Sequence, residues 1–220
     1  MNAAMSKIFL EILGPERQKV FGQLAEFRDD GYLAGGTALA LQLDHRVSVD
    51  FDVFTYKPIS ARLRASITKH FSIQQVHLNT SDQYTFTTHE NIEVTFVWFD
   101  YPLIQPLVPT SSISLASIVD IAANKANTLG LRAVWRDYVD LFWLMREEGV
   151  ALQDIIAWAK QKHSTEFVEA QFLEQLVYFT DLTVTPIQFL KKRYITQDIQ
   201  SFLQKVVGAY LDTRRKQELR

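Results

Sequence analysis

The sequence predicts an α+β fold, in which a small mixed β-sheet with flanking helices is followed by a helical C-terminal subdomain. Up to about residue 100, short apolar strands alternate with amphipathic helices. Three prolines, Pro102, Pro106 and Pro109, then indicate an extended linker. Beyond this linker the hydrophobic pattern is helical throughout. We therefore expect an α/β domain at residues 1–105 and a helical domain at residues 106–220.

The first domain contains segments of both kinds. Helices are expected at residues 16–28, 37–43 and 61–70, and strands at 32–34, 49–55, 73–78, 84–88 and 92–98. Ser60 is a favourable N-cap for the third of these helices. Because the order is strand–helix–strand–helix followed by a meander, we expect a small mixed sheet with helices packed against it.

The second domain is expected to be built from helices alone. They are predicted at residues 114–129, 133–148, 152–163, 166–179 and 197–215, with a short one near 186–191. Trp135, Trp143 and Trp158 recur at the spacing of helical core positions. We expect these rings to pack inside rather than to stack on bases.

The composition excludes several classes of protein. Lys and Arg number 23 against 25 Asp and Glu, and the net charge of −2 excludes a strongly basic nucleic-acid coat or a polybasic membrane binder. There is no cysteine, which excludes disulfides, zinc fingers and thiol catalysis. No apolar run reaches the ~18 residues of a membrane span, and the N-terminus has no signal-peptide pattern. We therefore expect a cytoplasmic protein.

The most informative motif is Leu33-Ala34-Gly35-Gly36-Thr37, between an expected strand and a helix. Paired glycines let the backbone approach a ligand closely. The N-terminus of the following helix presents unpaired N–H groups to an anion, and Thr37 adds a hydroxyl. A Gly-Gly pair alone is more often only a turn.

Asp50 and Asp52 form the second motif, on the strand expected at residues 49–55. There they share one face, about 6.6 Å apart along the strand. Their repulsion is roughly 2.5 kcal/mol at an effective dielectric constant near 20, and a divalent cation reverses its sign. Oxygen ligands of this kind suit Mg²⁺, which also takes phosphate oxygens. A single Asp-x-Asp is usually a solvated strand face, but beside a phosphate cradle it favours metal-assisted phosphoryl or nucleotidyl transfer.

These motifs resemble the nucleotidyltransferase fold shared with DNA polymerase β and, more narrowly, the AbiEii toxin family of prokaryotic nucleotidyltransferase-like proteins. The resemblance covers residues 33–144. It is carried by GGTALAL at residues 35–41, His45-Arg46, Ser48, DFD at 50–52, DIAANK at 120–125 and RDYVDL at 136–141.

The resemblance implies a nucleoside triphosphate as substrate, Mg²⁺ as cofactor, an RNA as one class of acceptor and a cognate antitoxin as partner. It implies that Asp50 and Asp52 bind the metal. The nucleotide-binding residues would be Gly35, Gly36, Thr37, Arg46, Ser48 and Lys125.

One position departs from the family pattern. The fold supplies a third carboxylate from a later strand, and Thr95 stands at that position here. Glu93 lies two residues earlier and so points to the same face. Loss of a general base typically lowers the reaction rate by a factor of 10²–10⁴. Either Glu93 is the third catalytic carboxylate, or the protein is a weak enzyme, uses another base or only binds nucleotide.

Lys125 falls on an otherwise apolar stripe of its expected helix, and a buried lysine needs an anion. That anion is a nucleotide phosphate, the carboxylate of Asp137, or both together. Arg136 and Asp140, four residues apart on the next helix, are expected to form a surface pair.

Three hypotheses follow from the sequence. The first is a nucleotidyltransferase-like protein that transfers a nucleotidyl group to an acceptor hydroxyl. The second is a catalytically degenerate nucleotide-binding or interaction module with the same fold. The third is a structural protein in which the glycine turn and the acidic strand coincide by chance.

Overall fold

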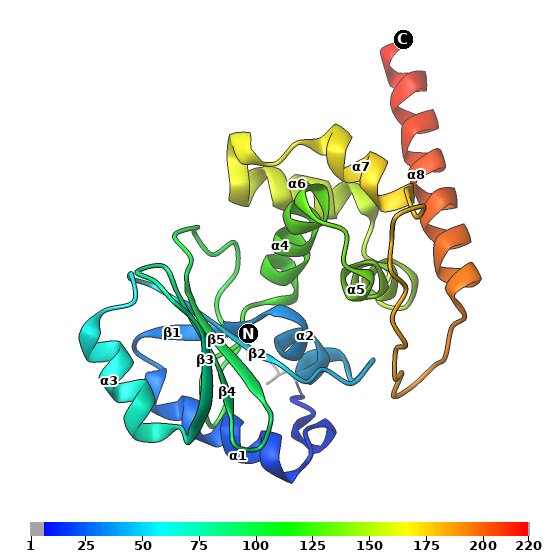
Figure 1. Cartoon of the computed structure of the whole chain (residues 1–220). Coiled ribbons are helices and arrows are strands. Elements are labelled where there is room, and N and C mark those ends of the chain that lie inside the picture. The colour runs from blue at the N-terminus through cyan, green and yellow to red at the C-terminus, as the bar shows by residue number, and fades with distance from the viewer. Residues whose placement is uncertain (1–6, 220) are drawn as a thin grey trace. The chain divides into compact units, whose positions relative to one another are not determined.

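A computed structural model describes residues 7–219, and the chain divides into two compact units between Ile118 and Val119 (Figure 1). The first unit holds a β-sheet with its helices, and the second holds helices without a sheet in its described residues. The predicted α+β fold class is therefore confirmed. The domain limits at residues 105 and 106 stay a prediction, but Leu115 forms β-bridges with Leu33 and Val108 and so belongs to the first unit.

The sheet has five strands in the order β1-β2-β5-β4-β3. They are β1 (Gly31–Ala34), β2 (Phe51–Thr55), β3 (Ile73–Asn79), β4 (Gln83–Thr88) and β5 (Glu93–Trp98). Strands β2 and β5 pair in parallel and the other neighbours pair antiparallel, which makes the sheet mixed, as predicted. In this register Asp52 lies between Ala34 of β1 and Thr95 of β5.

The helices of the first unit are η1 (Leu10–Ile12), α1 (Pro15–Gln23), η2 (Leu24–Phe27), α2 (Gly35–Leu43) and α3 (Ala61–His70). The predicted helix at 16–28 is thus α-helical to Gln23 and tightens to a 3₁₀ turn. Helix α3 has the predicted limits, because the Oγ of Ser60 accepts a hydrogen bond from the N–H of Leu63 at 3.1 Å.

One face of the sheet packs against aromatic rings. The ring of Phe27 in η2 lies 5.0 Å from Phe96 of β5 and 5.8 Å from Phe71, which in turn lies 5.3 Å from Phe86 of β4, all between centroids. Along β2, Phe51, Val53 and Thr55 are buried, whereas the alternate residues Asp52 and Phe54 are partly exposed. The period-2 alternation of the strand therefore turns Asp52 away from this core.

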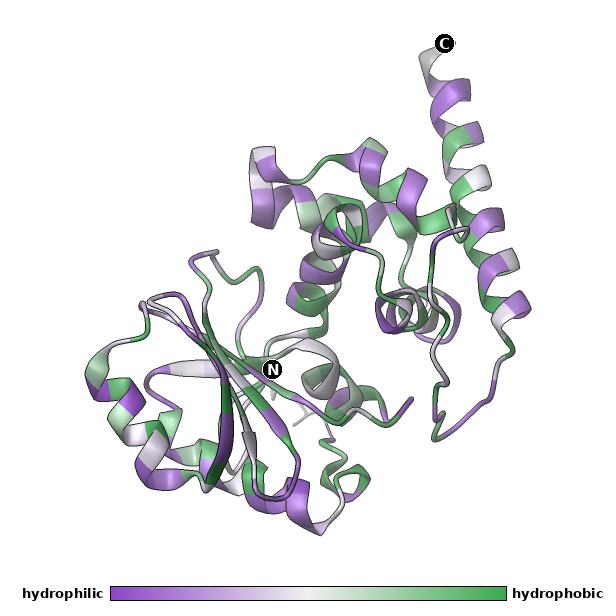
Figure 2. Ribbon diagram, viewed as in Figure 1, coloured by the Kyte–Doolittle hydropathy of each residue, from purple (hydrophilic) through white to green (hydrophobic). Residues whose placement is uncertain are grey.

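The second unit contains α4 (Ile118–Leu131), α5 (Trp135–Arg146), α6 (Leu152–His163), η3 (Ser164–Glu166), α7 (Glu169–Val177) and α8 (Thr196–Glu218). Hydrophobic and hydrophilic residues alternate along α8 (Figure 2). Throughout the described part of the chain, every helix is too short or too polar to cross a membrane.

The prediction of a short helix near residues 186–191 is wrong, because that stretch forms no helix. Instead, the chain between α7 and α8 is held by aromatic contacts. The rings of Phe189 and Tyr194 both lie 6.2 Å from the ring of Trp143 on α5. Trp143 and Trp135 are buried, as predicted.

Two charged side chains are buried together in the second unit. Nζ of Lys162 on α6 lies 2.5 Å from Oδ1 of Asp120 on α4, and the two side chains are 0% and 1% exposed. This pair was not predicted from the sequence. The available signal was that Lys162 follows Ile155 and Ala159 on the apolar stripe of its helix, where a lysine requires a buried anion.

His163 lies beside this pair and is itself buried. Burial, followed by the charge of Lys162, lowers the pKa of His163 from its ordinary value of 6.5 to about 4. Between these two values the unfolded chain binds the proton more readily than the folded chain. His163 therefore contributes stability above pH 6.5 that is lost as the pH falls toward 4.

We expect the thermal unfolding midpoint of the wild type to fall more steeply between pH 6.5 and 4 than that of His163→Gln. The measurement is a thermal melt followed by circular dichroism at half-unit pH steps. His89→Gln, at an exposed histidine, is the matched control and should keep the wild-type slope. Parallel curves for wild type and His163→Gln would contradict the prediction.

Candidate active site

The glycine turn and the acidic strand meet in the first unit. Gly35 has a φ of +66°, and a β-carbon added to it would lie 2.4 Å from Oδ2 of Asp52. Such a position favours glycine, because the backbone conformation strains any other residue and a side chain would displace the carboxylate of Asp52. The carboxylate of Asp52 therefore lies directly against the turn at the N-terminus of α2, so the fold brings the two sequence motifs together.

Gly36 is in close contact with the loop that precedes β2. A β-carbon at Gly36 would lie 2.7 Å from Nη2 of Arg46 and 3.1 Å from Oγ of Ser48. Arg46 is only 2% exposed, and its Nη1 donates to the carbonyl of Val47 at 3.1 Å. The guanidinium is thus a fixed positive charge packed against the glycine turn rather than a mobile group on an exposed loop.

Thr37 connects the two motifs by a hydrogen bond. Its buried hydroxyl donates to the main-chain carbonyl of Asp50. Since a hydroxyl has one proton to donate, Thr37 holds the backbone of Asp50 beside the first turn of α2.

The strand predicted at residues 49–55 begins later than expected. Strand β2 starts at Phe51, so Asp50 belongs to the preceding loop and Val49 is 42% exposed. The carbonyl of Asp50 accepts a hydrogen bond from the Thr37 side chain. The position of Asp50 is therefore set by this bond and not by strand alternation. Both Asp50 and Asp52 are partly exposed.

Thr95 occupies the place beside Asp52 on the neighbouring strand. Its Oγ1 lies 3.1 Å from Oγ1 of Thr85, so this strand position carries a hydroxyl that is hydrogen-bonded to a second hydroxyl. Glu93 is the exposed first residue of β5, two residues from Thr95. Among residues 7–219, no group of three or more His, Asp and Glu side chains is arranged to hold a metal ion. The role of Glu93 as third carboxylate stays a prediction.

The donor set around the turn fits Mg²⁺. The partly exposed carboxylate of Asp52 lies against the N-terminus of α2, where a buried guanidinium also packs, and the partly exposed Asp50 is held beside the same turn through its main-chain carbonyl. Mg²⁺ is typically held by one or two carboxylates, with substrate phosphates and waters as its remaining ligands. Anions are in turn favoured at the N-terminus of a helix.

Lys125, in the second unit, has two carboxylate partners. Its Nζ lies 2.6 Å from Oδ1 of Asp137 and 2.7 Å from Oδ2 of Asp140. The predicted ion pair with Asp137 is confirmed. The expectation of a surface position was wrong for Asp140, whose side chain is fully buried. The sequence did contain a signal for the position of Asp140. Asp137 and Asp140 are three residues apart, which places both side chains on the same face of the helix.

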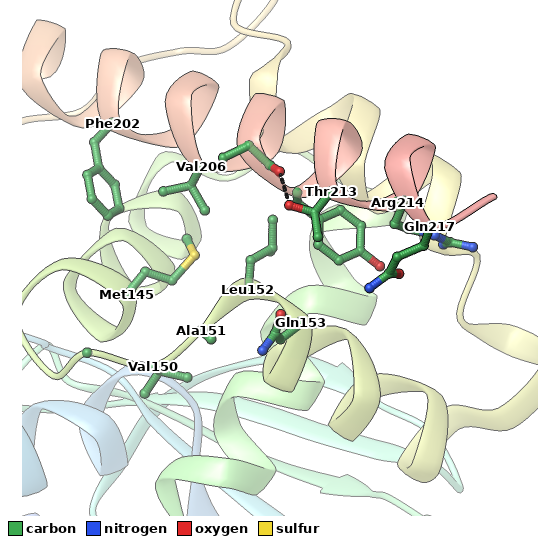
Figure 3. A pocket seen from close by; sticks show the side chains of 13 residues that line it. Met145, Val150, Ala151, Leu152, Gln153, Phe202, Val206, Thr213, Arg214 and Gln217 are labelled. Atoms are coloured by element: carbon green, nitrogen blue, oxygen red, sulfur yellow. Dashed lines mark hydrogen bonds between the residues drawn. The ribbon is translucent and has the colours of Figure 1, made fainter. Parts of the chain in front are cut away.

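A cavity of about 620 Å³ also lies within the second unit, between the α5–α6 connection and α8 (Figure 3). Met145, Phe202 and Val206 lie toward one end in Figure 3, and Thr213 and Gln217 toward the other. The predicted site residues do not line this cavity.

Comparisons with known proteins identify the family and the fold. The family model described as "Nucleotidyl transferase AbiEii toxin, Type IV TA system" matches residues 20–218. An uncharacterised protein of Aquifex aeolicus (strain VF5) is 30% identical over 190 residues, which cover 84% of this chain and 89% of that protein.

Two crystal structures from Helicobacter pylori share the fold. One is described as that of a proposed nucleotidyltransferase, with a TM-score of 0.59, 19% identity and coverage of 94% of this chain and 99% of its own. The other is JHP933, with a TM-score of 0.58, 19% identity and coverage of 94% and 96%. The fold is therefore that of nucleotidyltransferases, and the match over residues 20–218 shows that the chain belongs to the AbiEii nucleotidyl transferase toxin family.

Proposed function

We propose that the protein binds a nucleoside triphosphate with Mg²⁺ and transfers its nucleotidyl group to an acceptor hydroxyl. The observation that carries this proposal is the carboxylate of Asp52 lying against Gly35 at the start of α2, with Asp50 tied to the same turn through Thr37. Membership of a nucleotidyl transferase toxin family supports the reaction class.

In the proposed site each residue has a distinct task. Asp50 and Asp52 would hold Mg²⁺, which when bound neutralises phosphate charge and orients the triphosphate. The backbone N–H groups of Gly35 and Gly36 would face the phosphates, as at other helix N-termini. Arg46 adds positive charge from within the protein, and Ser48 packs beside it.

The reaction requires that the acceptor hydroxyl lose its proton. Its oxygen then bonds to the α-phosphorus, while the bond to pyrophosphate breaks and pyrophosphate leaves with the electron pair. Thr95 is not a base at neutral pH, so Glu93 is the proposed proton acceptor.

Lys125 is proposed to bind nucleotide phosphates. Its two carboxylate partners, Asp137 and Asp140, would compete with such a phosphate for the ammonium group.

We also propose an RNA as the acceptor class and a cognate antitoxin protein as the partner. The matching family, which is described as part of a type IV toxin–antitoxin system, supports the antitoxin.

A second candidate function is a nucleotide-binding or interaction module without turnover. The observation that favours it is Thr95, which occupies the strand position beside Asp52 where the fold supplies an acid. Binding and transfer must therefore be measured separately.

We expect Asp52→Asn to weaken binding of Mg²⁺-ATP by 10-fold or more, because it removes a carboxylate of the proposed metal site. Isothermal titration calorimetry measures this binding. Asp82→Asn removes an equal charge from an exposed turn of the same unit and should bind as the wild type does. Equal binding by Asp52→Asn and the wild type would remove the proposed site.

Transfer is tested with labelled triphosphates and bulk RNA. Incorporation that is present in the wild type and absent in Asp52→Asn supports the enzyme. Tight binding of Mg²⁺-ATP by the wild type without incorporation supports the module.

A further inference from the structure

Two neighbouring rows of side chains cross the sheet on the face that carries Asp52. The first row is Ala34, Asp52 and Thr95, and the second is Tyr32, Phe54 and Val97. Because residues two apart on a strand share a face, the second row lies directly alongside the first. The second row, whose side chains are apolar or aromatic, thus lies beside the row that contains the proposed metal site.

Two further rings extend the second row. The centroid of Phe54 lies 4.2 Å from that of Phe99, with 31° between the ring planes, and Phe99 lies 4.8 Å from Tyr101. The N–H of Phe99 donates to the carbonyl of Thr55 at 3.2 Å, which fixes Phe99 beside the end of β2. We call Phe54, Phe99 and Tyr101 the aromatic row.

The aromatic row is not part of the aromatic core. Phe27, Phe86 and Phe96 of that core are 0% exposed and lie on the other face of the sheet, whereas all three rings of the aromatic row are partly exposed. Aromatic rings aligned with part of their surface accessible to a ligand are the feature on which nucleobases stack.

We propose that the aromatic row is a stacking platform for a nucleobase next to the metal site. This inference rests on the proposed function. Phe54 lies about 6.6 Å along β2 from Asp52, a separation that one nucleotide spans from its phosphate to its base. A base bound here belongs either to the incoming triphosphate or to the last nucleotide of the acceptor, since both meet at the reacting phosphorus.

The test compares ligands with and without a base. Phe99→Leu keeps an apolar side chain and removes the ring, and Phe99→Tyr restores a ring. The probes are Mg²⁺-ATP, Mg²⁺-tripolyphosphate, which has no base, and a single-stranded hexa-adenylate RNA labelled for fluorescence anisotropy. Phe99 is chosen because, unlike Phe54, it lies outside the strand that carries Asp52.

We expect Phe99→Leu to weaken binding of ATP or of the hexanucleotide about 10-fold, within the range measured for one stacked base. Binding of tripolyphosphate should be unchanged, and Phe99→Tyr should bind all three probes as the wild type does. A loss confined to ATP assigns the platform to the incoming nucleotide. A loss confined to the hexanucleotide assigns it to the acceptor.

Unchanged binding of both base-containing probes overturns the platform, and so does an equal loss for tripolyphosphate, which indicates a structural role only. If Phe99→Leu does not fold, Tyr101→Leu serves the same comparison. Failure of the proposed nucleotide site is a different result, because the wild type would then bind neither Mg²⁺-ATP nor Mg²⁺-tripolyphosphate, and failure of the proposed transfer alone would leave both probes bound without incorporation.

Discussion

Replacing Lys162 with methionine is expected to lower the free energy of unfolding by about 3–5 kcal/mol. Lys162 and Asp120 are both buried and lie 2.5 Å apart. Methionine fills a similar volume but leaves the carboxylate of Asp120 without its cation. The variant must then bury an uncompensated charge or take up a proton, and either outcome favours the unfolded chain.

Chemical denaturation at pH 7 measures this effect, and the neighbouring pair of Lys160 and Glu169 provides the control. Lys160 stands on the same helix, but its side chain is 52% exposed. Lys160→Met should therefore lower stability by about 1 kcal/mol or less. A loss in Lys162→Met no larger than that in Lys160→Met would contradict the prediction.

The double variant Asp120→Leu with Lys162→Met tests the physical reason. Replacing both partners of a buried ion pair by apolar side chains is often neutral or stabilising. We therefore expect the double variant to be more stable than Lys162→Met alone. If it is instead less stable than Lys162→Met, the loss reflects packing at Lys162 rather than an unpaired charge.

Gly35→Ala is expected to abolish measurable binding of Mg²⁺-ATP and to lower stability by about 2–5 kcal/mol. An L-residue in the left-handed region costs about 1–2 kcal/mol, and overpacking adds about 1–3 kcal/mol. The new methyl group would lie 2.4 Å from Oδ2 of Asp52, so the carboxylate must move away from the turn. Calorimetric titration measures the binding, and denaturation measures the stability.

Gly149→Ala separates the two contributions. Gly149 also has a positive φ, +70°, but no atom lies within 4 Å of its added β-carbon. It should show the backbone cost alone, about 1–2 kcal/mol, with binding of Mg²⁺-ATP retained. Retention of wild-type binding in Gly35→Ala would show that the contact between Gly35 and Asp52 does not shape the site.

Local patterns predicted much of the first unit. The N-cap at Ser60 set the start of α3, and the Gly-Gly pair before an apolar helix located the turn that Asp52 faces. These features depend on residues a few positions apart, whose backbone conformation is constrained by their own chemistry.

Other features depended on residues far apart in the chain. The start of β2 was predicted too early, at residue 49 instead of 51, and the carbonyl of Asp50 accepts a hydrogen bond from the side chain of Thr37 on α2. No helix forms near residues 186–191, because Phe189 and Tyr194 pack against Trp143 on α5. In both places a tertiary contact overrides the local propensity.

Local patterns in the sequence predicted the fold class, the order of the strands and helices in the first unit, and the presence of a glycine turn and an acidic strand, because hydrophobic periodicity and glycine chemistry are local. Only the tertiary structure decided that Arg46 is buried against Gly36, that Asp140 points inward to Lys125, and that Asp120 pairs with Lys162. A buried charge can be recognised from the apolar stripe on which it falls. The partner of Lys162 depends on how the distant helices α4 and α6 pack, and the spacing along the chain did not reveal it.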